Sequence, residues 1–233
     1  MSFSLGNLFF GKNKYICVCC KKRLDKDTAH KYIKKIGVCK DCFSSFSISS
    51  PASPYKGRGY VKYIMSPFEY TGKLRDAFLK YKFDNCYSYA PLFALLMEDY
   101  IKSYNIWTDF DFIVPMPLHE KRFKERGYNQ SELIAEYIGK ITGLPVRTDL
   151  IYRIKNTQKQ SLVYGNDKLH NVEKAFSCTE NLKNKSIIIF DDICTTGLTL
   201  SSCSKALHKA GAENICALTF AIHEQKKLPI IEY

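Results

Sequence analysis

Apolar residues recur at helical spacing from about residue 70 onward. Leu74, Ala77, Phe78 and Tyr81 are three or four positions apart, with lysines and arginines among the residues between them. This pattern predicts a helix with one buried face. Further helices are predicted over residues 91–101, 130–141 and 199–210, and the one over 130–141 ends at the stop signal Gly143-Leu144-Pro145.

Short, fully apolar runs lie between these helices. The segments FDFIVPM (110–116) and SIIIF (186–190) predict buried strands, and shorter strands are predicted over 146–152 and 215–221. Strands that alternate with helices indicate βα units, which pair as a parallel sheet. The pattern therefore predicts an α/β fold with a central parallel sheet.

Four of the ten cysteines form two C-x2-C pairs, Cys17/Cys20 and Cys39/Cys42. Two intervening residues let a tight turn point both sulfurs at one ion, and two such turns complete a tetrahedral shell for zinc. Cys19 could replace a neighbour, although C-x2-C matches the second pair better. A redox dithiol is the alternative. We expect structural Zn2+, which would supply folding free energy to a segment too short to bury a core.

These signals divide the chain into three parts. Residues 1–50 form the predicted four-cysteine zinc ribbon, residues 51–69 a linker that leads into the main domain, and residues 70–233 the α/β domain. The linker is predicted because Ser, Pro and Gly are frequent between residues 44 and 60. Residues 153–183 are polar without a clear period, which is typical of a lid or a disordered segment.

Charge adds an anionic partner to this picture. The formal net charge is +12, and residues 1–60 carry twelve Lys and Arg against three Asp and Glu. Such an asymmetry indicates nucleic acid as a partner, with a solvated basic surface as the alternative. A content of 45% apolar residues is enough for a core and excludes disordered and collagen-like classes. No apolar run is long enough to span a membrane, so we expect a cytoplasmic protein without membrane insertion.

The most informative segment is IIIFDDICTTGLT, residues 187–199. A buried strand that ends in Asp191 and Asp192 delivers two carboxylates to the edge of the sheet where ligands bind in α/β folds. The Thr/Gly loop that follows opens a helix, whose N-terminus offers N–H groups to a phosphate. Carboxylates accept hydrogen bonds from sugar hydroxyls or hold Mg2+. These residues together predict a phosphosugar site, with a solvated acid pair as the alternative.

Residues 187–199 resemble the phosphoribosyl-pyrophosphate (PRPP) signature of type I phosphoribosyltransferases. The whole chain resembles the ComF family of ComFC-like competence proteins, which join an N-terminal zinc ribbon to such a domain. The likeness extends to KYKF (80–83), VPMPLH (114–119), RGYNQ (126–130), QSL (160–162), NV (171–172) and AF (175–176). Two departures are Lys168 and His170 in place of arginines, and Cys194, which adds an oxidation-sensitive position to the signature.

The resemblance implies a role for each signature residue. Asp191 and Asp192 would meet the ribose 2′- and 3′-hydroxyls, directly or through Mg2+. The 5-phosphate would lie in a cradle formed by Thr195, Thr196, Gly197 and Thr199. A loop after Met116 would hold the pyrophosphate with three local cations, for which a solvated charged loop is the alternative: Lys121, Arg122 and Arg126. Residues 153–171 would form a mobile hood.

Two functions are compatible with these residues. The first is Mg2+-assisted phosphoribosyl transfer from PRPP to an acceptor that no residue identifies. The second is a non-catalytic accessory role in DNA uptake, in which the protein binds single-stranded DNA and senses PRPP. The expected partners are therefore PRPP, single-stranded DNA and proteins of the DNA-uptake machinery. A zinc-dependent transcription factor has little support, because the sequence predicts one cysteine module and no recognition helix.

Overall fold

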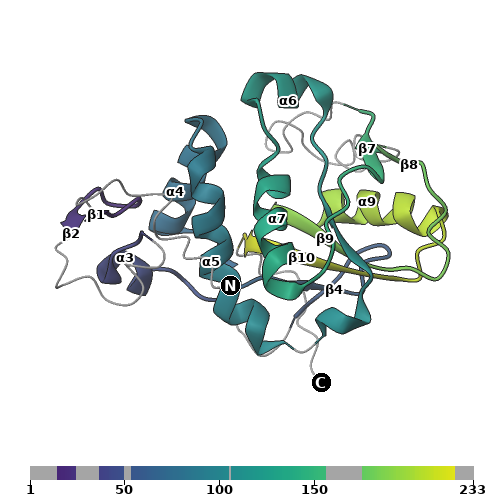
Figure 1. Ribbon diagram of the computed structural model, residues 1–233, viewed down its shortest axis with the longest axis horizontal. Helices are drawn as coiled ribbons and strands as arrows, with labels where there is room; N and C mark the ends of the chain where they lie inside the picture. Colours follow the sequence, from purple (N-terminus) through teal and green to yellow (C-terminus); the bar gives the residue numbers. More distant parts are fainter. Residues whose placement is uncertain (1–14, 25–36, 50–53, 105, 156–174, 224–233) are drawn as a thin grey trace.

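The computed structural model describes residues 15–24, 37–49, 54–104, 106–155 and 175–223. Its centre is a six-stranded sheet with the order β3-β4-β10-β9-β6, in which β5 also pairs with β10 (Figure 1). The strands are β3 (Tyr55–Lys56), β4 (Tyr63–Met65), β5 (Phe68–Glu69), β6 (Phe112–Pro115), β9 (Ser186–Cys194) and β10 (Asn214–Ile222). Every pairing in this sheet is parallel except that of β3 with β4. The expected α/β fold with a central parallel sheet is confirmed.

Helices cover both faces of the sheet (Figure 1). One face packs against α4 (Gly72–Phe83), α5 (Ala90–Ser103) and α7 (Gln130–Thr142), and the other against α9 (Leu198–Lys209). The periodic positions Leu74, Ala77, Phe78 and Tyr81 are all buried, as the helical spacing predicts. The ring of Phe78 stacks on Phe220 of β10 at 5.0 Å between centroids. Among the described residues, no helix has the length and apolar character needed to cross a membrane.

A two-stranded hairpin stands beside the main sheet. It pairs β7 (Ile151–Arg153) with β8 (Phe176–Cys178) in antiparallel register. The strand that we predicted over 146–152 therefore begins only at Ile151. Val146 contributes an isolated bridge to Ile113. Residues 156–174 lie outside the described residues, and with them most of the predicted hood, including Lys168 and His170.

Residues 54–69, which we expected to be a linker, contribute β3, β4 and β5 to the main sheet. These strands have two or three residues each, too few to show an alternating pattern. The segment before them is also ordered against the sheet, because Ile48 bridges Phe68 and the Glu69 N–H donates to the Ser47 carbonyl at 2.9 Å. The chain therefore enters the fold earlier than its Ser- and Pro-rich composition suggests.

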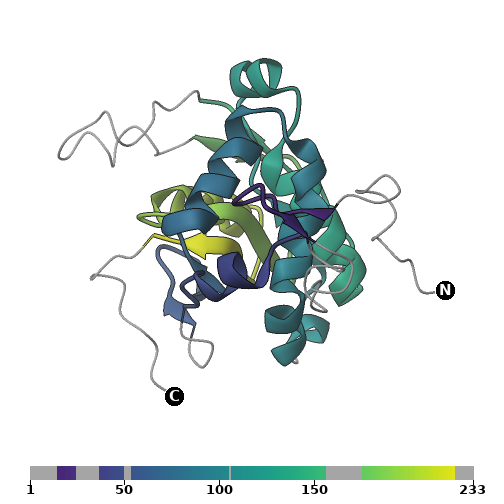
Figure 2. The same cartoon turned by 90° about the vertical axis from the view of Figure 1, so that its left-hand side faces the viewer.

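The cysteine module comprises β1 (Tyr15–Ile16), β2 (Arg23–Leu24) and the short helix α3 (Lys40–Ser44). Figure 2 shows it in front of α4 and α5. Cys17, Val38 and Cys42 belong to the same buried apolar cluster as Phe78 of α4 and Phe93 of α5. The ring of Phe46, just after α3, meets Phe68 edge-on at 6.1 Å. The module is thus packed against the main domain through apolar contacts.

Candidate functional site

The two adjacent aspartates lie within β9 rather than after it. The strand runs to Cys194, and Asp191 pairs in register with Thr219 of β10. The strand continues through two acids because the parallel neighbour β10 satisfies its backbone groups. Both carboxylates are contacted by helices that pack on one face of the sheet, Asp192 by Lys82 of α4 and Asp191 by Ser131 of α7.

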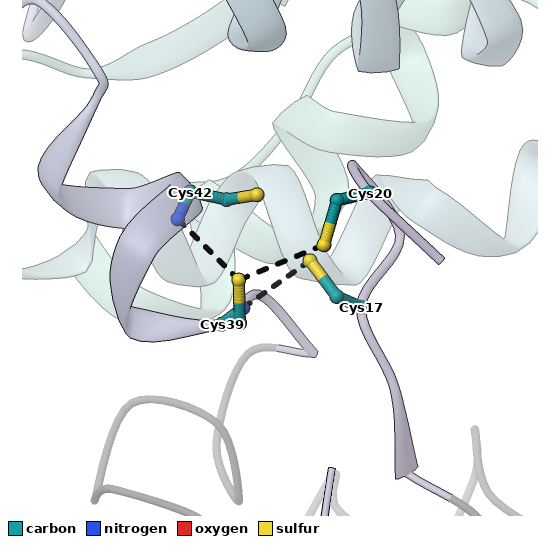
Figure 3. A group of neighbouring side chains, drawn as sticks. All are labelled: Cys17, Cys20, Cys39 and Cys42. Atoms are coloured by element: carbon teal, nitrogen blue, oxygen red, sulfur yellow. Dashed lines mark hydrogen bonds between the residues drawn. The ribbon is translucent and has the colours of Figure 1, made fainter. Parts of the chain in front are cut away.

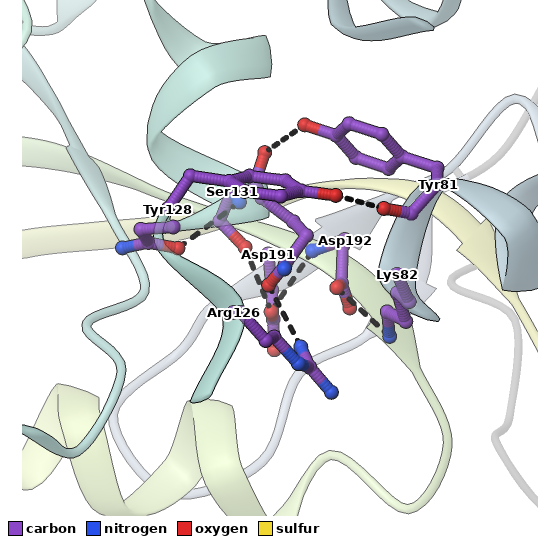
Figure 4. A network of polar contacts seen from close by, with 9 residues as sticks. Tyr81, Lys82, Arg126, Tyr128, Ser131, Asp191 and Asp192 are labelled. Carbon is purple, nitrogen blue, oxygen red and sulfur yellow. Dashed lines mark hydrogen bonds and ion pairs between the residues drawn. The ribbon is translucent and has the colours of Figure 1, made fainter. Parts of the chain in front are cut away.

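The Asp192 carboxylate is paired with a lysine from α4. Lys82 Nζ lies 2.8 Å from Asp192 Oδ2, and the two side chains are only 18% and 13% exposed (Figure 4). The ammonium also lies 5.3 Å from the centre of the Phe78 ring. Both charges are therefore largely withdrawn from water, where an ion pair is screened less than on the surface.

The Asp191 carboxylate accepts two hydrogen bonds (Figure 4). The Asp192 N–H donates to its Oδ1 at 2.9 Å and the Ser131 hydroxyl at 3.4 Å. Burial, followed by the charge of Asp192, raises the pKa of Asp191 to about 7. Ser131 is held in the first turn of α7, where the Asn129 side chain caps the helix by accepting from the Ser131 N–H at 3.1 Å.

The Thr/Gly loop joins β9 to α9, as the sequence predicts. Gly197 has φ +70°, a left-handed conformation that favours glycine, and α9 begins at the next residue. The Thr196 hydroxyl accepts from the Leu198 N–H at 3.4 Å. The structure therefore places Thr195, Thr196, Gly197 and Thr199 at the N-terminus of a twelve-residue helix, where an anion is favoured by the N–H groups and the helix dipole.

An arginine from the β3–β4 connection lies beside this loop. Arg58 Nη1 donates to the Thr196 carbonyl at 3.5 Å, and a Cβ added at Gly197 would lie 3.9 Å from Arg58 Cβ. Tyr60 holds the same connection on α9, because its ring stacks on His208 at 3.8 Å and its N–H donates to Ser204. The expected linker thus contributes a cation to the candidate phosphate loop.

The basic segment after Met116 is a helix, not the loop we expected. It is α6 (Glu120–Arg126), capped at its start by the His119 side chain and ended by left-handed Gly127. Lys121 is exposed and Arg122 half-buried, whereas Arg126 approaches the acid pair. Arg126 donates to Gln130 Oε1 at 2.8 Å and stacks over the Phe83 ring at 5.1 Å. The helix therefore turns Lys121 toward solvent, whereas Arg122 lies one turn before Arg126 and is close enough for its charge, after the larger effect of burial, to lower the pKa of Arg126.

A hollow lies between the end of β6, α6 and β7. Its lining includes Leu118, Glu132 and Arg153. Burial raises the pKa of the Glu132 carboxyl and lowers that of the Arg153 guanidinium, which lies over the Phe176 ring at 5.5 Å. Asp191 acts on Arg153 electrostatically, so the hollow adjoins the acid pair.

The four paired cysteines come together in space. Ligand atoms of Cys17, Cys20, Cys39 and Cys42 all lie within 4.8 Å of one another (Figure 3). Cys39 also caps α3 with its sulfur. Four sulfurs at such distances suit a tetrahedral zinc ion, so the donor set fits the expected metal. Cys19 is outside this group: its side chain hydrogen-bonds to Cys17, which is the largest of the effects that lower the pKa of Cys17 to about 3.

Cys194 is a buried part of the core. It is 2% exposed, and burial raises its pKa to about 12. Thiol oxidation and nucleophilic attack require an accessible thiolate. The structure therefore favours a core residue without a chemical role at this position over a nucleophile or an oxidation-sensitive site.

Sequence reasoning did not assign roles to Lys82, Ser131 or Arg58. The first two lie in or beside the KYKF and RGYNQ segments that carry the family resemblance, so that signal could have drawn attention to them. Arg58 lies outside every motif that the sequence analysis identified. It reaches the site only through the turn between two very short strands.

The chain is similar to a known family and to several known proteins. The family model "Phosphoribosyl transferase domain" matches residues 131–233. The chain is 26% identical over 219 residues to Competence protein F of Haemophilus influenzae, covering 90% of this chain and 91% of that protein. It is 27% identical over 217 residues to Competence protein ComFC of Bacillus subtilis, covering 84% and 79%. It is also 27% identical over 105 residues to the DNA utilization protein YhgH of Escherichia coli O157:H7, covering 45% and 46%.

Proposed function

We propose that this chain, which belongs to the ComF family of competence proteins and carries a phosphoribosyltransferase domain, binds PRPP with Mg2+ at the end of β9 and transfers the phosphoribosyl group to an acceptor. One observation carries the proposal. A single strand–loop–helix unit presents two carboxylates and a helix N-terminus to the same edge of the sheet. A ribose diol and a phosphate on the same sugar match these two features.

The roles of the residues follow from their chemistry. The carboxylates of Asp191 and Asp192 accept hydrogen bonds from the ribose hydroxyls, and the first-turn N–H groups of α9 donate to the 5-phosphate. Arg126, half-buried near Asp192, neutralises charge on the pyrophosphate side. Mg2+ is suited to the oxygen ligands present here and, when bound, stabilises the charge of the departing pyrophosphate.

The proposed reaction is a substitution at the anomeric carbon. The bond from C1 to pyrophosphate breaks, a bond from C1 to the acceptor atom forms, and pyrophosphate leaves with the bonding electron pair. The contribution of the protein is to position the sugar and to neutralise the leaving group.

The test is calorimetry of PRPP binding in excess Mg2+. Asp191→Asn with Asp192→Asn should fold and lose binding, because the diol and the metal lose their carboxylate acceptors. The matched control, Asp76→Asn with Asp109→Asn, removes the same charge from two exposed positions and should bind as the wild type does. Unchanged PRPP affinity in the folded double variant of the acid pair would contradict the proposal.

A second candidate function is single-stranded DNA binding without turnover. It is favoured by the basic excess in residues 1–60, of which Lys21, Lys22 and Arg23 are exposed in the cysteine module. The names of the similar proteins refer to competence and to DNA utilization. Pyrophosphate release from PRPP, measured with candidate acceptors and with or without single-stranded DNA, separates the two functions.

A further inference from the structure

Lys82 forms an ion pair with Asp192, one of the two aspartates that the proposed function assigns to sugar and metal. Its ammonium lies 2.8 Å from Asp192 Oδ2, and neither side chain is more than 18% exposed. Lys82 stands on α4, outside residues 131–233 that match the phosphoribosyltransferase family model. The acid pair therefore has an internal counter-ion, supplied by a part of the chain that the family model does not cover.

The positive charge of Lys82 disfavours the binding of a divalent cation that arrives without an anionic ligand. A cation that binds both aspartates either displaces Lys82 from Asp192 or shares this carboxylate with it, and in both cases the ammonium lies close to a second positive charge. The lysine has little access to water in which to disperse this repulsion, and the Phe78 ring lies on another side of it. Arg126 adds a further positive charge near Asp192.

An anionic ligand removes this electrostatic repulsion between the ammonium and the cation. A diphosphate that arrives with the cation offers the displaced ammonium a new partner, and lysine reaches such a partner through a flexible four-carbon stem. We propose that Lys82 makes cation binding at the acid pair conditional on an anionic phosphate ligand. The inference rests on the proposed phosphosugar site, and it assigns Lys82 as the residue that couples metal to ligand.

The experiment compares Lys82→Met with Lys80→Met in the full chain with its zinc retained. Lys80 lies two residues earlier on α4, so its side chain leaves the helix in another direction. The first arm measures Mn2+ binding alone by electron paramagnetic resonance, and the second measures PRPP binding by calorimetry in excess Mg2+. Circular dichroism and thermal unfolding verify that each variant is folded.

We expect opposite effects in the two arms. Lys82→Met should bind Mn2+ alone more tightly by about fivefold or more, because the carboxylate is released. It should bind PRPP about tenfold more weakly, because a charged donor to the ligand is removed. Lys80→Met should match the wild type in both arms, and Lys82→Arg, which keeps the charge, should retain weak Mn2+ binding. A merely structural ion pair would weaken both ligands together.

Two results would overturn the inference. One is equal Mn2+ affinity in folded Lys82→Met and Lys80→Met. The other is a gain in Mn2+ affinity that persists when Lys82→Met is combined with Asp192→Asn, since the effect must act through Asp192. If the wild type binds no PRPP, the proposed function fails, and the Mn2+ arm alone then decides whether Lys82 excludes the free cation.

Discussion

Asp191, which we propose as a ligand-binding residue, is costly for folding when it is ionised. Its pKa is raised to about 7, first by burial and then by Asp192. A carboxyl whose pKa is higher in the folded than in the unfolded state binds more protons when folded, so stability falls as pH rises between the two values. The cost begins near the unfolded pKa of about 4 and is complete above the folded value.

We therefore expect Asp191→Asn to raise the melting temperature, and to raise it more at pH 8 than at pH 5. Thermal unfolding across this pH range measures the difference. Asp111→Asn is the control of opposite sign, because the Lys185 ammonium and the Ser186 N–H lower the pKa of Asp111. The stability that Asp111 contributes is present above its unfolded pKa, so its replacement should lower the melting temperature at pH 8. A gain for Asp191→Asn that does not grow with pH would contradict the assignment.

For single residues, the sequence predicted where in the fold the two aspartates lie, but not how they are paired. Asp191 and Asp192 follow a run of apolar residues, and that local signal was sufficient to predict the acid pair at the sheet edge. The ion pair of Asp192 with Lys82 joins a strand to a helix far away in the chain. Such a pairing depends on the packing of α4 against the sheet, which no local pattern contains.

Among the elements, the connection between β3 and β4 is the one that links the start of the domain to the proposed ligand site. Gly59 has φ +68°, and a Cβ there would meet Ser201 Oγ at 2.5 Å, so the turn packs directly on α9. This packing holds Arg58 against the Thr196 carbonyl. The connection thereby brings a guanidinium to the Thr/Gly loop, which a distant part of the sequence forms.

Arg58→Ala should weaken PRPP binding by about fivefold, because a charge-assisted hydrogen bond to the 5-phosphate is removed. The melting temperature should hardly change, because Arg58 is exposed. Calorimetry measures the affinity. Lys56→Ala is the matched control, since Lys56 is an exposed cation on β3 and should leave PRPP binding unchanged. Equal affinities in the two variants would show that Arg58 does not contact the ligand.

Elements with a long period were predictable, and short or polar ones were not. Helices α4, α5, α7 and α9 all follow from the spacing of apolar residues. The strand β9 was predicted to end before its acids, because polar residues are not typical of a buried strand, yet β10 carries it on to Cys194. The seven residues of α6 are mostly charged, with no apolar face to signal a helix.

For the molecule as a whole, the cysteine module is more than an appendage. Cys17 and Cys42 are buried in the same cluster as residues of α4 and α5, and Lys21 Nζ donates to the Tyr89 hydroxyl at 3.3 Å. The sequence predicted the module from its cysteine spacing. It did not predict this packing, because the residues that meet are far apart in the chain.

Replacing Cys17 and Cys20 with Ser should release the zinc and unfold the module. Because the module covers apolar surface of the main domain, the melting temperature of that domain should fall too, while PRPP binding persists at low temperature. Metal analysis and thermal unfolding measure both effects. Cys86→Ser, outside the four-cysteine group, should retain zinc and stability. Purified protein without zinc would contradict the metal assignment.

The excess of positive charge in the N-terminal part predicts how the whole chain binds single-stranded DNA. A fragment that starts at residue 55 keeps β3 and β4 but lacks most of this charge, so it should bind far more weakly at low salt. The salt dependence should also be shallower, by a log–log slope of about 0.7 for each DNA phosphate that the fragment no longer neutralises. Fluorescence anisotropy at several salt concentrations measures both quantities. Equal affinities and slopes would show that the N-terminal charge is only a solvated surface.

The position of β10 between β4 and β9 limits where this protein can be divided. A fragment limited to the family match, residues 131–233, would lack β4 and β5 on one side of the two longest strands and β6 on the other. The largely buried strand β10 would then form an open edge, and β9 a second one. Unpaired apolar edges recruit one another in solution, so the excised region would aggregate rather than fold. The recognisable domain is therefore smaller than the unit that can remain soluble.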